Sequence, residues 1–208
     1  MRGLRETLER AAGHEKLVVL CSFQKEESVL FHGLLPLVPG ARVFTIDTGV
    51  LFPETLETWK RFEDRFGLRI DVEDASGAGG SVSSWTGPDH CCGADKVAAL
   101  ERALAGADAW ITGIRREQGP TREATELVET DARRGIAKYN PLAAWTEQDL
   151  WRAIHERDLP YHPLHDQGYA SIGCAPCTKP GTGRDGRWAG TGKLECGLHV
   201  TPAETIAP

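Results

Sequence analysis

A run of apolar residues from Leu17 to Cys21 constrains the fold more than any other feature of this chain. The run is continuous and short, which is typical of a strand buried on both faces of a parallel sheet. Further runs of this kind are separated by segments with the apolar spacing of amphipathic helices. We therefore expect strands over 17–21, 43–46, 68–72, 109–113, 127–130 and 136–139, and helices over 3–12, 28–38, 53–66, 93–104 and from Thr146 onward.

Strands that alternate with helices predict an α/β fold, Rossmann-like, with a mostly parallel sheet and flanking helices. From residue 160 onward the composition shifts to Pro, Gly, His and Cys, with little periodicity. We therefore expect an α/β domain over 1–160 and a C-terminal segment over 161–208, together forming one compact unit. The Gly- and Ser-rich stretch 75–87 predicts a mobile loop.

The composition narrows the class of protein. The 208 residues are 40% apolar and 26% charged, as in globular proteins, and no apolar run reaches the length of a membrane span. The N-terminus lacks the apolar block of a signal peptide, so a cytoplasmic location is expected. The net charge of −6 argues against a nucleic-acid scaffold. It does not argue against a small anionic ligand, whose site needs only local positive charge.

Six cysteines in a cytoplasmic chain point to metal binding or catalysis rather than to disulfides. Cys91 and Cys92 are adjacent, and Cys174 and Cys177 form a Cys-x-x-Cys. Four thiolates can hold a [4Fe–4S] cluster, and they can also hold a tetrahedral zinc ion. Adjacent cysteines cannot easily share one metal atom but can bind two irons of a cubane, which favours the cluster. Cys21, within an apolar run, is expected in the core.

Cys196 stands apart from the other cysteines, in a Gly-rich segment without an apolar flank. Lys193 and His199 lie within a few residues of it, and Arg184 and Arg187 lie a little upstream. Nearby cations make a cysteine more nucleophilic by favouring its thiolate. Cys196 is therefore the candidate nucleophile.

Three polar loops follow expected strands, over 22–28, 47–55 and 113–122, and the last contains three arginines. Ligands of open α/β sheets bind beyond the carboxyl ends of the strands. Arginine suits phosphate and sulfate oxygens, because its guanidinium donates in pairs. The loops therefore predict a nucleotide site in the domain over 1–160. No Gly-x-Gly-x-x-Gly and no Walker-type loop is present.

These loops and the tail resemble the phosphoadenosine-phosphosulfate reductase family over roughly residues 15–199. The matching segments are Ser22-Phe23-Gln24-Lys25-Glu26-Glu27-Ser28, the loop from Ile46 to Thr55, Arg115-Arg116-Glu117-Gln118 with Thr121-Arg122, and Glu195-Cys196-Gly197-Leu198-His199. The resemblance implies an adenine-nucleotide α-hydrolase-like fold. The chain departs from the family at Gly119, where Ser is usual, and at Asp95, where Arg is frequent.

The resemblance also implies functional roles. A Cys-Cys pair with a later Cys-x-x-Cys marks the branch that carries an iron–sulfur cluster and prefers adenylyl sulfate (APS). It implies Cys196 as the catalytic residue and Cys91, Cys92, Cys174 and Cys177 as ligands of a [4Fe–4S] cluster. The residues implied to bind substrate are Lys96, Arg184, Arg187, His199, Ser22, Phe23, Gln24, Thr48, Gly49, Leu51 and Arg115.

The activity implied is the reduction of APS to sulfite and AMP in sulfate assimilation and cysteine biosynthesis. Cys196 would form an S-sulfonate, which a separate thioredoxin or glutaredoxin would release as sulfite. The alternatives are a reductase of 3′-phosphoadenylyl sulfate (PAPS), a non-catalytic zinc-stabilised nucleotide-binding protein, and an ATP pyrophosphatase or adenylyltransferase. No nucleic-acid or membrane partner is expected, and the oligomeric state stays open.

Overall fold

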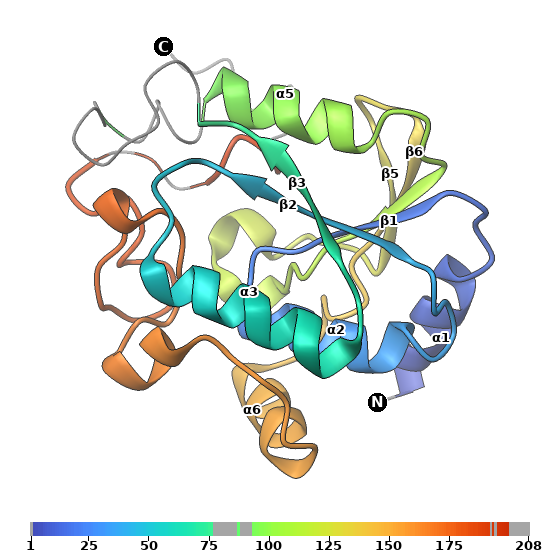
Figure 1. Ribbon diagram of the computed structural model, residues 1–208, viewed down its shortest axis with the longest axis horizontal. Coiled ribbons are helices and arrows are strands. Elements are labelled where there is room, and N and C mark those ends of the chain that lie inside the picture. The colour runs from blue at the N-terminus through green and yellow to red at the C-terminus, as the bar shows by residue number, and fades with distance from the viewer. Residues whose placement is uncertain (1, 77–86, 88–92, 192, 194, 200–208) are drawn as a thin grey trace.

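The computed structural model describes residues 2–76, 87, 93–191, 193 and 195–199. Its centre is a six-stranded sheet in the order β3-β2-β1-β4-β6-β5 (Figure 1). All neighbouring strands are parallel except β5, which runs antiparallel to β6. The strands are β1 (Leu17–Leu20), β2 (Arg42–Asp47), β3 (Ile70–Asp74), β4 (Ala109–Ile111), β5 (Val128–Asp131) and β6 (Ile136–Tyr139). The predicted α/β class with a mostly parallel sheet is confirmed.

Helices cover both faces of the sheet. In Figure 1, α5 lies on one face, while α1, α2 and α3 lie on the other. The α-helices are α1 (Arg2–Ala11), α2 (Lys25–Leu34), α3 (Pro53–Phe66), α5 (Ala94–Ala103) and α6 (Glu147–Glu156). Short 3-10 turns shape the loops, and they are η3 (Arg116–Gln118), η4 (Pro120–Arg122), η5 (Pro163–Gln167) and η6 (Ala175–Cys177). No helix in the described part of the chain is long and apolar enough to cross a membrane.

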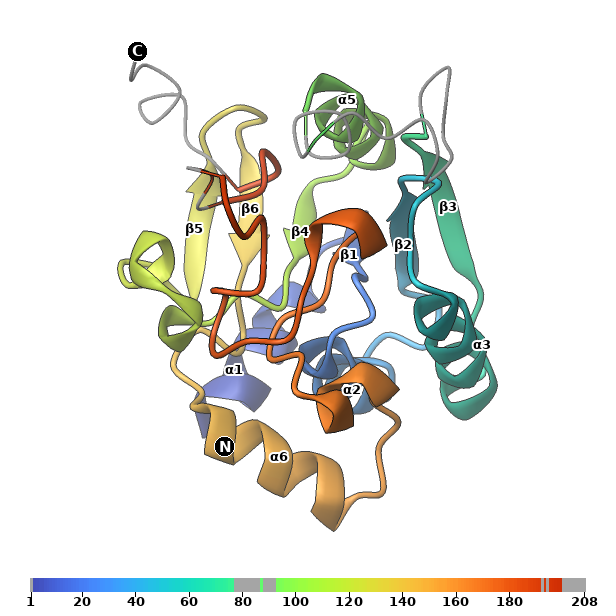
Figure 2. The same ribbon diagram turned by 90° about the vertical axis from the view of Figure 1, so that its left-hand side faces the viewer.

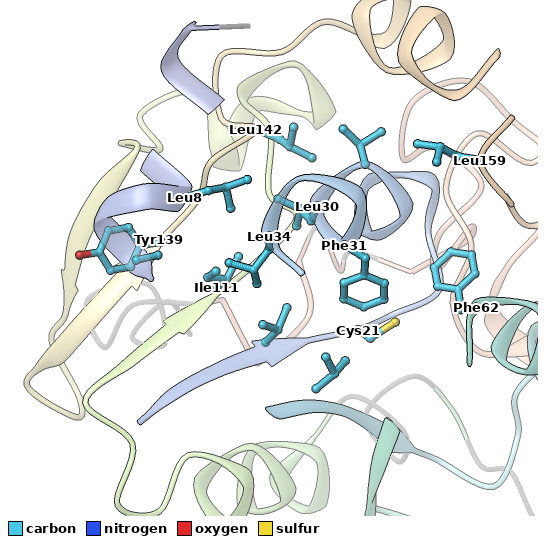
Figure 3. Close-up of a cluster of buried hydrophobic side chains, with 14 of the residues drawn as sticks. Leu8, Cys21, Leu30, Phe31, Leu34, Phe62, Ile111, Tyr139, Leu142 and Leu159 are labelled. Atoms are coloured by element: carbon cyan, nitrogen blue, oxygen red, sulfur yellow. The ribbon is translucent and has the colours of Figure 1, made fainter. Parts of the chain in front are cut away.

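The central strands are buried from both sides, as the apolar run at 17–21 predicts. Val19 and Cys21 face the larger core beneath α1, α2 and α3, which Figure 3 shows with Phe31 and Phe62 among its side chains. The alternate residues Val18 and Leu20 pack in the second core, beneath α5. Cys21 is therefore a core residue, as predicted. Side chains that alternate between two cores hold β1 in one register.

Two helices start where the sequence predicts, at Pro53 and after Thr146. Helix α3 starts at Pro53 and ends at Gly67, whose φ of 63° lies in the left-handed region that favours glycine. Helix α6 starts after Thr146, whose hydroxyl accepts a hydrogen bond from the amide of Asp149 at 3.1 Å. Local sequence therefore determines these three helix ends.

Helix α2 and strand β3 differ from the prediction by two residues or more at both ends. Helix α2 starts at Lys25 rather than at residue 28, because the Glu27 carboxylate accepts a hydrogen bond from the amide of Gln24 at 2.8 Å and closes the first turn. Pro36 then prevents the helix from continuing to residue 38. Strand β3 covers 70–74 rather than 68–72, because its ladder with β2 pairs Val43 with Ile70 and continues to Asp74. The mobile loop predicted over 75–87 lies mostly outside the described residues.

The segment after residue 160 lies along the carboxyl edge of the sheet. Figure 2 looks onto this edge, and the segment, coloured orange to red, crosses in front of the strands. Leu51 forms an antiparallel bridge with Cys174, and the Ala175 amide donates to the carbonyl of Val50 at 2.8 Å. The His162 ring pairs with the Thr55 hydroxyl of α3 at 2.9 Å. These contacts bring the Cys-x-x-Cys turn to the loop after β2.

Replacing Phe62 with alanine is expected to lower the free energy of unfolding by about 3–5 kcal/mol, since the cavity left by a buried aromatic ring is not refilled. Phe62 is fully buried and meets Phe23, Phe31 and Phe66 edge to face. The control is Leu56→Ala on the same helix, which is 53% exposed and should change stability by no more than about 0.5 kcal/mol. Urea titration followed by circular dichroism measures both, and equal losses would contradict the assignment of this core.

Candidate active site

A cavity of about 440 Å³ lies at the carboxyl end of the sheet. Its walls come from the loops after β1, β2 and β4, from helix α5 and from the C-terminal segment. Most of the predicted site residues line it, namely Ser22, Phe23, Gln24, Leu51, Lys96, Arg115, Arg184, Arg187, Cys196, His199 and the expected cluster ligand Cys174. The fold thus brings together residues that lie far apart in the sequence.

Thr48, Gly49 and Cys177 do not line the cavity. The Thr48 hydroxyl lies 3.2 Å from the sulfur of Cys174, so it contacts the Cys-x-x-Cys turn. Gly49 has a φ of 71°, and its amide donates to the Asp47 carboxylate at 2.8 Å. Both residues shape the loop after β2, which carries Leu51 to the cavity.

The loop after β1 is held in an unusual backbone conformation. Phe23 has a φ of 59°, is buried, and stacks on Trp59 with ring centroids 5.3 Å apart. A bulky residue with positive φ is uncommon and persists only where the surroundings hold it. Gln24 exchanges two hydrogen bonds with the backbone of Ile172, at 2.8 and 3.0 Å. The loop is therefore clamped to the C-terminal segment.

The side chain of Glu27 closes the loop before helix α2. Its carboxyl group accepts hydrogen bonds from the Gln24 amide at 2.8 Å and from the Ser22 hydroxyl at 3.3 Å. Burial, together with the neighbouring Glu26 carboxylate, raises the pKa of Glu27 to about 8.

Arg115 lines the cavity, but its guanidinium forms ion pairs with three carboxylates of the protein. It is buried, and its guanidinium nitrogens lie 2.9 Å from Glu26, 2.7 Å from Glu147 and 3.1 Å from Glu117. Lys25, also buried, lies 3.0 Å from the Glu147 carboxylate. Burial would raise the pKa of Glu26, but Lys25 and Arg115 lower it below its usual value. Sequence reasoning missed this network, because its partners come from three separate loops.

Two arginines of the C-terminal segment form the cationic wall. Arg184 and Arg187 lie against the ring of Trp188, with guanidinium carbons 5.2 and 4.6 Å from its centre. Arg187 also donates to the carbonyl of Ile172 at 3.2 Å, and a Cβ at Gly173 would overlap its guanidinium. Glycine is therefore required at 173 for the arginine to reach this position.

Three buried nitrogens at the cavity have no hydrogen-bond partner within the described structure: Nε of Arg184, Nε of Arg187 and Nδ1 of His199. Buried polar atoms are nearly always paired. Unpaired arginine donors at a cavity wall suit an anionic ligand with several oxygens. The sequence-based expectation of a phosphate- or sulfate-binding surface agrees with this arrangement.

Cys196 is buried, with 6% of its surface exposed, and packs with Val50, Trp188 and the two cysteines of the Cys-x-x-Cys turn. His199, three residues later, stacks on Trp110 with an interplanar angle of 5°. Burial lowers the pKa of His199 well below its usual value, and Arg122 and Lys138 lower it further. Burial therefore disfavours the charged form of His199.

Cys174 and Cys177 are both buried on the η6 turn, and the Cys177 sulfur lies 3.6 Å from the carbonyl of Cys174. Cys91 and Cys92 lie outside the described residues. No three His, Cys, Asp or Glu side chains converge as a metal-binding group within the part of the chain that the structure describes. Two buried thiols on one turn fit two of the four ligands of an iron–sulfur cluster.

The chain is similar to known proteins over most of its length. The chain is 45% identical to a phosphoadenosine 5′-phosphosulfate reductase of Gloeobacter violaceus over 89% of this chain and 83% of that protein. It is 40% identical to an adenosine 5′-phosphosulfate reductase of Geobacillus kaustophilus over 89% and 84%, respectively.

The crystal structure of a phosphoadenylyl-sulfate reductase from Candida auris, a phosphate complex, superposes with a TM-score of 0.71. It is 24% identical and covers 85% of this chain and 90% of that one, so it supports the fold. The sequence profile of the phosphoadenosine phosphosulfate reductase domain matches residues 16–180. On this match and the identity to both relatives, the chain belongs to the phosphoadenosine phosphosulfate reductase family.

Proposed function

We propose that this protein is an oxidoreductase of sulfate assimilation that reduces adenylyl sulfate to sulfite and AMP, with Cys196 as the nucleophile. The observation that carries the proposal is the position of Cys196 on the cavity that Arg184 and Arg187 also line. The unpaired Nε donors of both arginines suit the phosphosulfate oxygens. Relatives at about 40% identity that are named adenosine 5′-phosphosulfate reductases support the choice of substrate.

In the first step, the Cys196 thiolate attacks the sulfur of the sulfate group. A sulfur–sulfur bond forms while the bond from that sulfur to the bridging oxygen breaks, and the electron pair leaves with AMP. Arg184 and Arg187 stabilise the negative charge that develops on the leaving phosphate. Cys196 is left as an S-sulfonate.

In the second step, a thiolate of thioredoxin or glutaredoxin attacks the Cys196 sulfur, and sulfite leaves with the electron pair. The second thiol of the reductant then resolves the mixed disulfide and restores Cys196. Because Cys196 is 6% exposed in the described structure, this step requires the tail to open. The proposal includes a cytoplasmic location, where cysteines stay reduced.

Cys91, Cys92, Cys174 and Cys177 would hold a [4Fe–4S] cluster. When bound, the cluster would add negative charge beside the anionic substrate. Lys96 lines the cavity and lies four residues after Cys92, where it would offset part of that charge. In this division, residues 1–160 bind the nucleotide and residues 161–208 carry the nucleophile and two cluster ligands.

A second candidate substrate is PAPS, because the relative from Gloeobacter violaceus is named a phosphoadenosine 5′-phosphosulfate reductase. The two nucleotides differ by one 3′-phosphate, so a direct comparison of turnover separates the two activities. The cysteine pattern favours APS.

Cys196→Ser is expected to lower sulfite release by about three orders of magnitude or more, because the nucleophile is lost. AMP binding should persist, since the hydroxyl leaves the arginine wall intact. Sulfite release with a thioredoxin system and AMP calorimetry measure the two properties. A serine variant that retains activity would contradict the assigned nucleophile.

The purified protein should use APS in preference to PAPS by about tenfold or more in kcat/KM, which corresponds to about 1.4 kcal/mol. Initial rates of sulfite formation with each nucleotide measure the ratio. A preference for PAPS would replace the proposed substrate by the second candidate.

Protein purified without oxygen is expected to be brown and to contain about four irons per chain. Cys174→Ser and Cys177→Ser should both lose iron and visible absorbance, because each removes a proposed ligand. Cys21→Ser is the control, because Cys21 lies in the core and should leave the iron content unchanged in the folded fraction. A colourless protein that contains zinc would exclude the cluster.

A further inference from the structure

Glu195, the residue before Cys196, links Arg122 of the loop after β4 to Arg184 of the C-terminal segment. Its carboxylate accepts hydrogen bonds from Nε and Nη2 of Arg122, both at 2.8 Å, and from Nη2 of Arg184 at 2.7 Å. Only 10% of the Glu195 side chain is exposed. A carboxylate gripped by two guanidinium groups with little solvent is among the stronger polar contacts a protein makes.

The same carboxylate fixes the backbone of the nucleophile. The amide of Cys196 donates to Glu195 Oε1 at 2.8 Å, and the hydroxyl of Thr121 donates to Oε2 at 3.2 Å. Thr121 and Arg122 belong to η4, in the loop after β4. Glu195 therefore ties the tail that carries Cys196 to the edge of the sheet.

The electrostatics keep this carboxylate charged. Burial would raise the pKa of Glu195, but the hydrogen bonds and positive charge of Arg122 and Arg184 lower it to about 2. Burial lowers the pKa of Arg184 to about 10, with a further contribution from the charge of Arg122. At neutral pH the three groups are therefore a carboxylate between two guanidinium ions.

This arrangement has two opposite consequences for an anionic substrate. Glu195 orients Cys196, which favours the chemical step. It also occupies Nη2 of Arg184, a donor that the phosphosulfate oxygens would otherwise receive, and its negative charge repels them. The contact that holds Cys196 in place therefore weakens the binding of the substrate anion.

We propose that Glu195 is a positioning residue that seats Cys196 by clamping the tail to Arg122, and that it competes with the substrate anion for Arg184. The inference rests on the proposed function for the identity of the anion, but the clamp itself consists of contacts within the protein. Substrate binding and tail closure are therefore coupled through one carboxylate.

Glu195→Gln separates the two consequences, because it keeps the size of the side chain and removes its charge. We expect kcat for sulfite formation to fall by about 10- to 100-fold, since the nucleophile is no longer held. In a Cys196→Ser background, where no reaction occurs, the same change should tighten APS binding by about threefold or more. Glu195→Asp, which keeps the charge, should lie between wild type and Glu195→Gln in kcat.

Glu123→Gln is the matched control, because Glu123 is an exposed carboxylate next to Arg122 in the same loop. It should leave kcat and APS affinity unchanged. Unchanged kcat in Glu195→Gln, or weaker APS binding in the double variant, would overturn the proposal. An aspartate variant less active than the glutamine variant would also overturn it, since charge would then not be the determinant.

Hydrogen exchange of the nucleotide-free holoprotein tests the clamp without reference to any reaction. The peptide that contains Cys196 should exchange about tenfold faster in Glu195→Gln than in wild type or Glu123→Gln, because the Cys196 amide loses a charged acceptor. Faster exchange with no turnover of APS by any variant would support the clamp and refute APS as the substrate. Unchanged exchange would refute the clamp even if APS is the substrate. Circular dichroism confirms that each variant is folded.

Discussion

The ion pairs of the buried Arg115 guanidinium are the interactions on which the site depends. It joins Glu26, from the start of α2, to Glu147, from the start of α6, and Lys25 reaches the same Glu147. Lys25, Glu26 and Arg115 are each no more than 3% exposed. Buried charges are costly unless they are paired, and removing one partner costs about 3–5 kcal/mol because it leaves the other uncompensated. The network therefore holds three loops in one arrangement around the cavity.

The C-terminal segment is built onto this frame. Lys25 donates to the carbonyl of Ala170, and Gln24 pairs with the backbone of Ile172. The bridge between Leu51 and Cys174 adds a contact from the loop after β2. The C-terminal segment has little regular structure, and hydrogen bonds to the loops that the Arg115 ion pairs hold together fix its position. This indirect support brings the Cys-x-x-Cys turn and the arginine wall to the carboxyl edge of the sheet.

Charge at the cavity is largely balanced within the protein. Arg115 is matched by Glu26 and Glu147, and Arg184 by Glu195. Buried arginines without such partners would destabilise the nucleotide-free protein. Under the proposed function, a substrate anion would compete with Glu195 for Arg184.

The sequence by itself determined the layers of the fold and the chemical types at the site. The apolar run at 17–21 predicts a strand buried on both faces, Pro53 starts α3, and Thr146 caps α6, because burial patterns and caps are local properties. The segment around Cys196 carries the family resemblance in five consecutive residues. The boundaries of α2 and β3 were less accurate, because a carboxylate cap and a ladder register set them.

Only the tertiary structure decided what each charged residue does. Arg115 and Arg184 look equivalent in sequence, yet the first is held by three carboxylates and the second shares one with Arg122. His199 lies three residues after Cys196, and burial lowers its pKa and disfavours its charged form. Some partners lie tens of residues away in the sequence, as Glu26 does from Arg115 and Glu195 from Arg122. The physical reason is that a charge is defined by its solvent exposure and its nearest opposite charge, and the folded chain sets both.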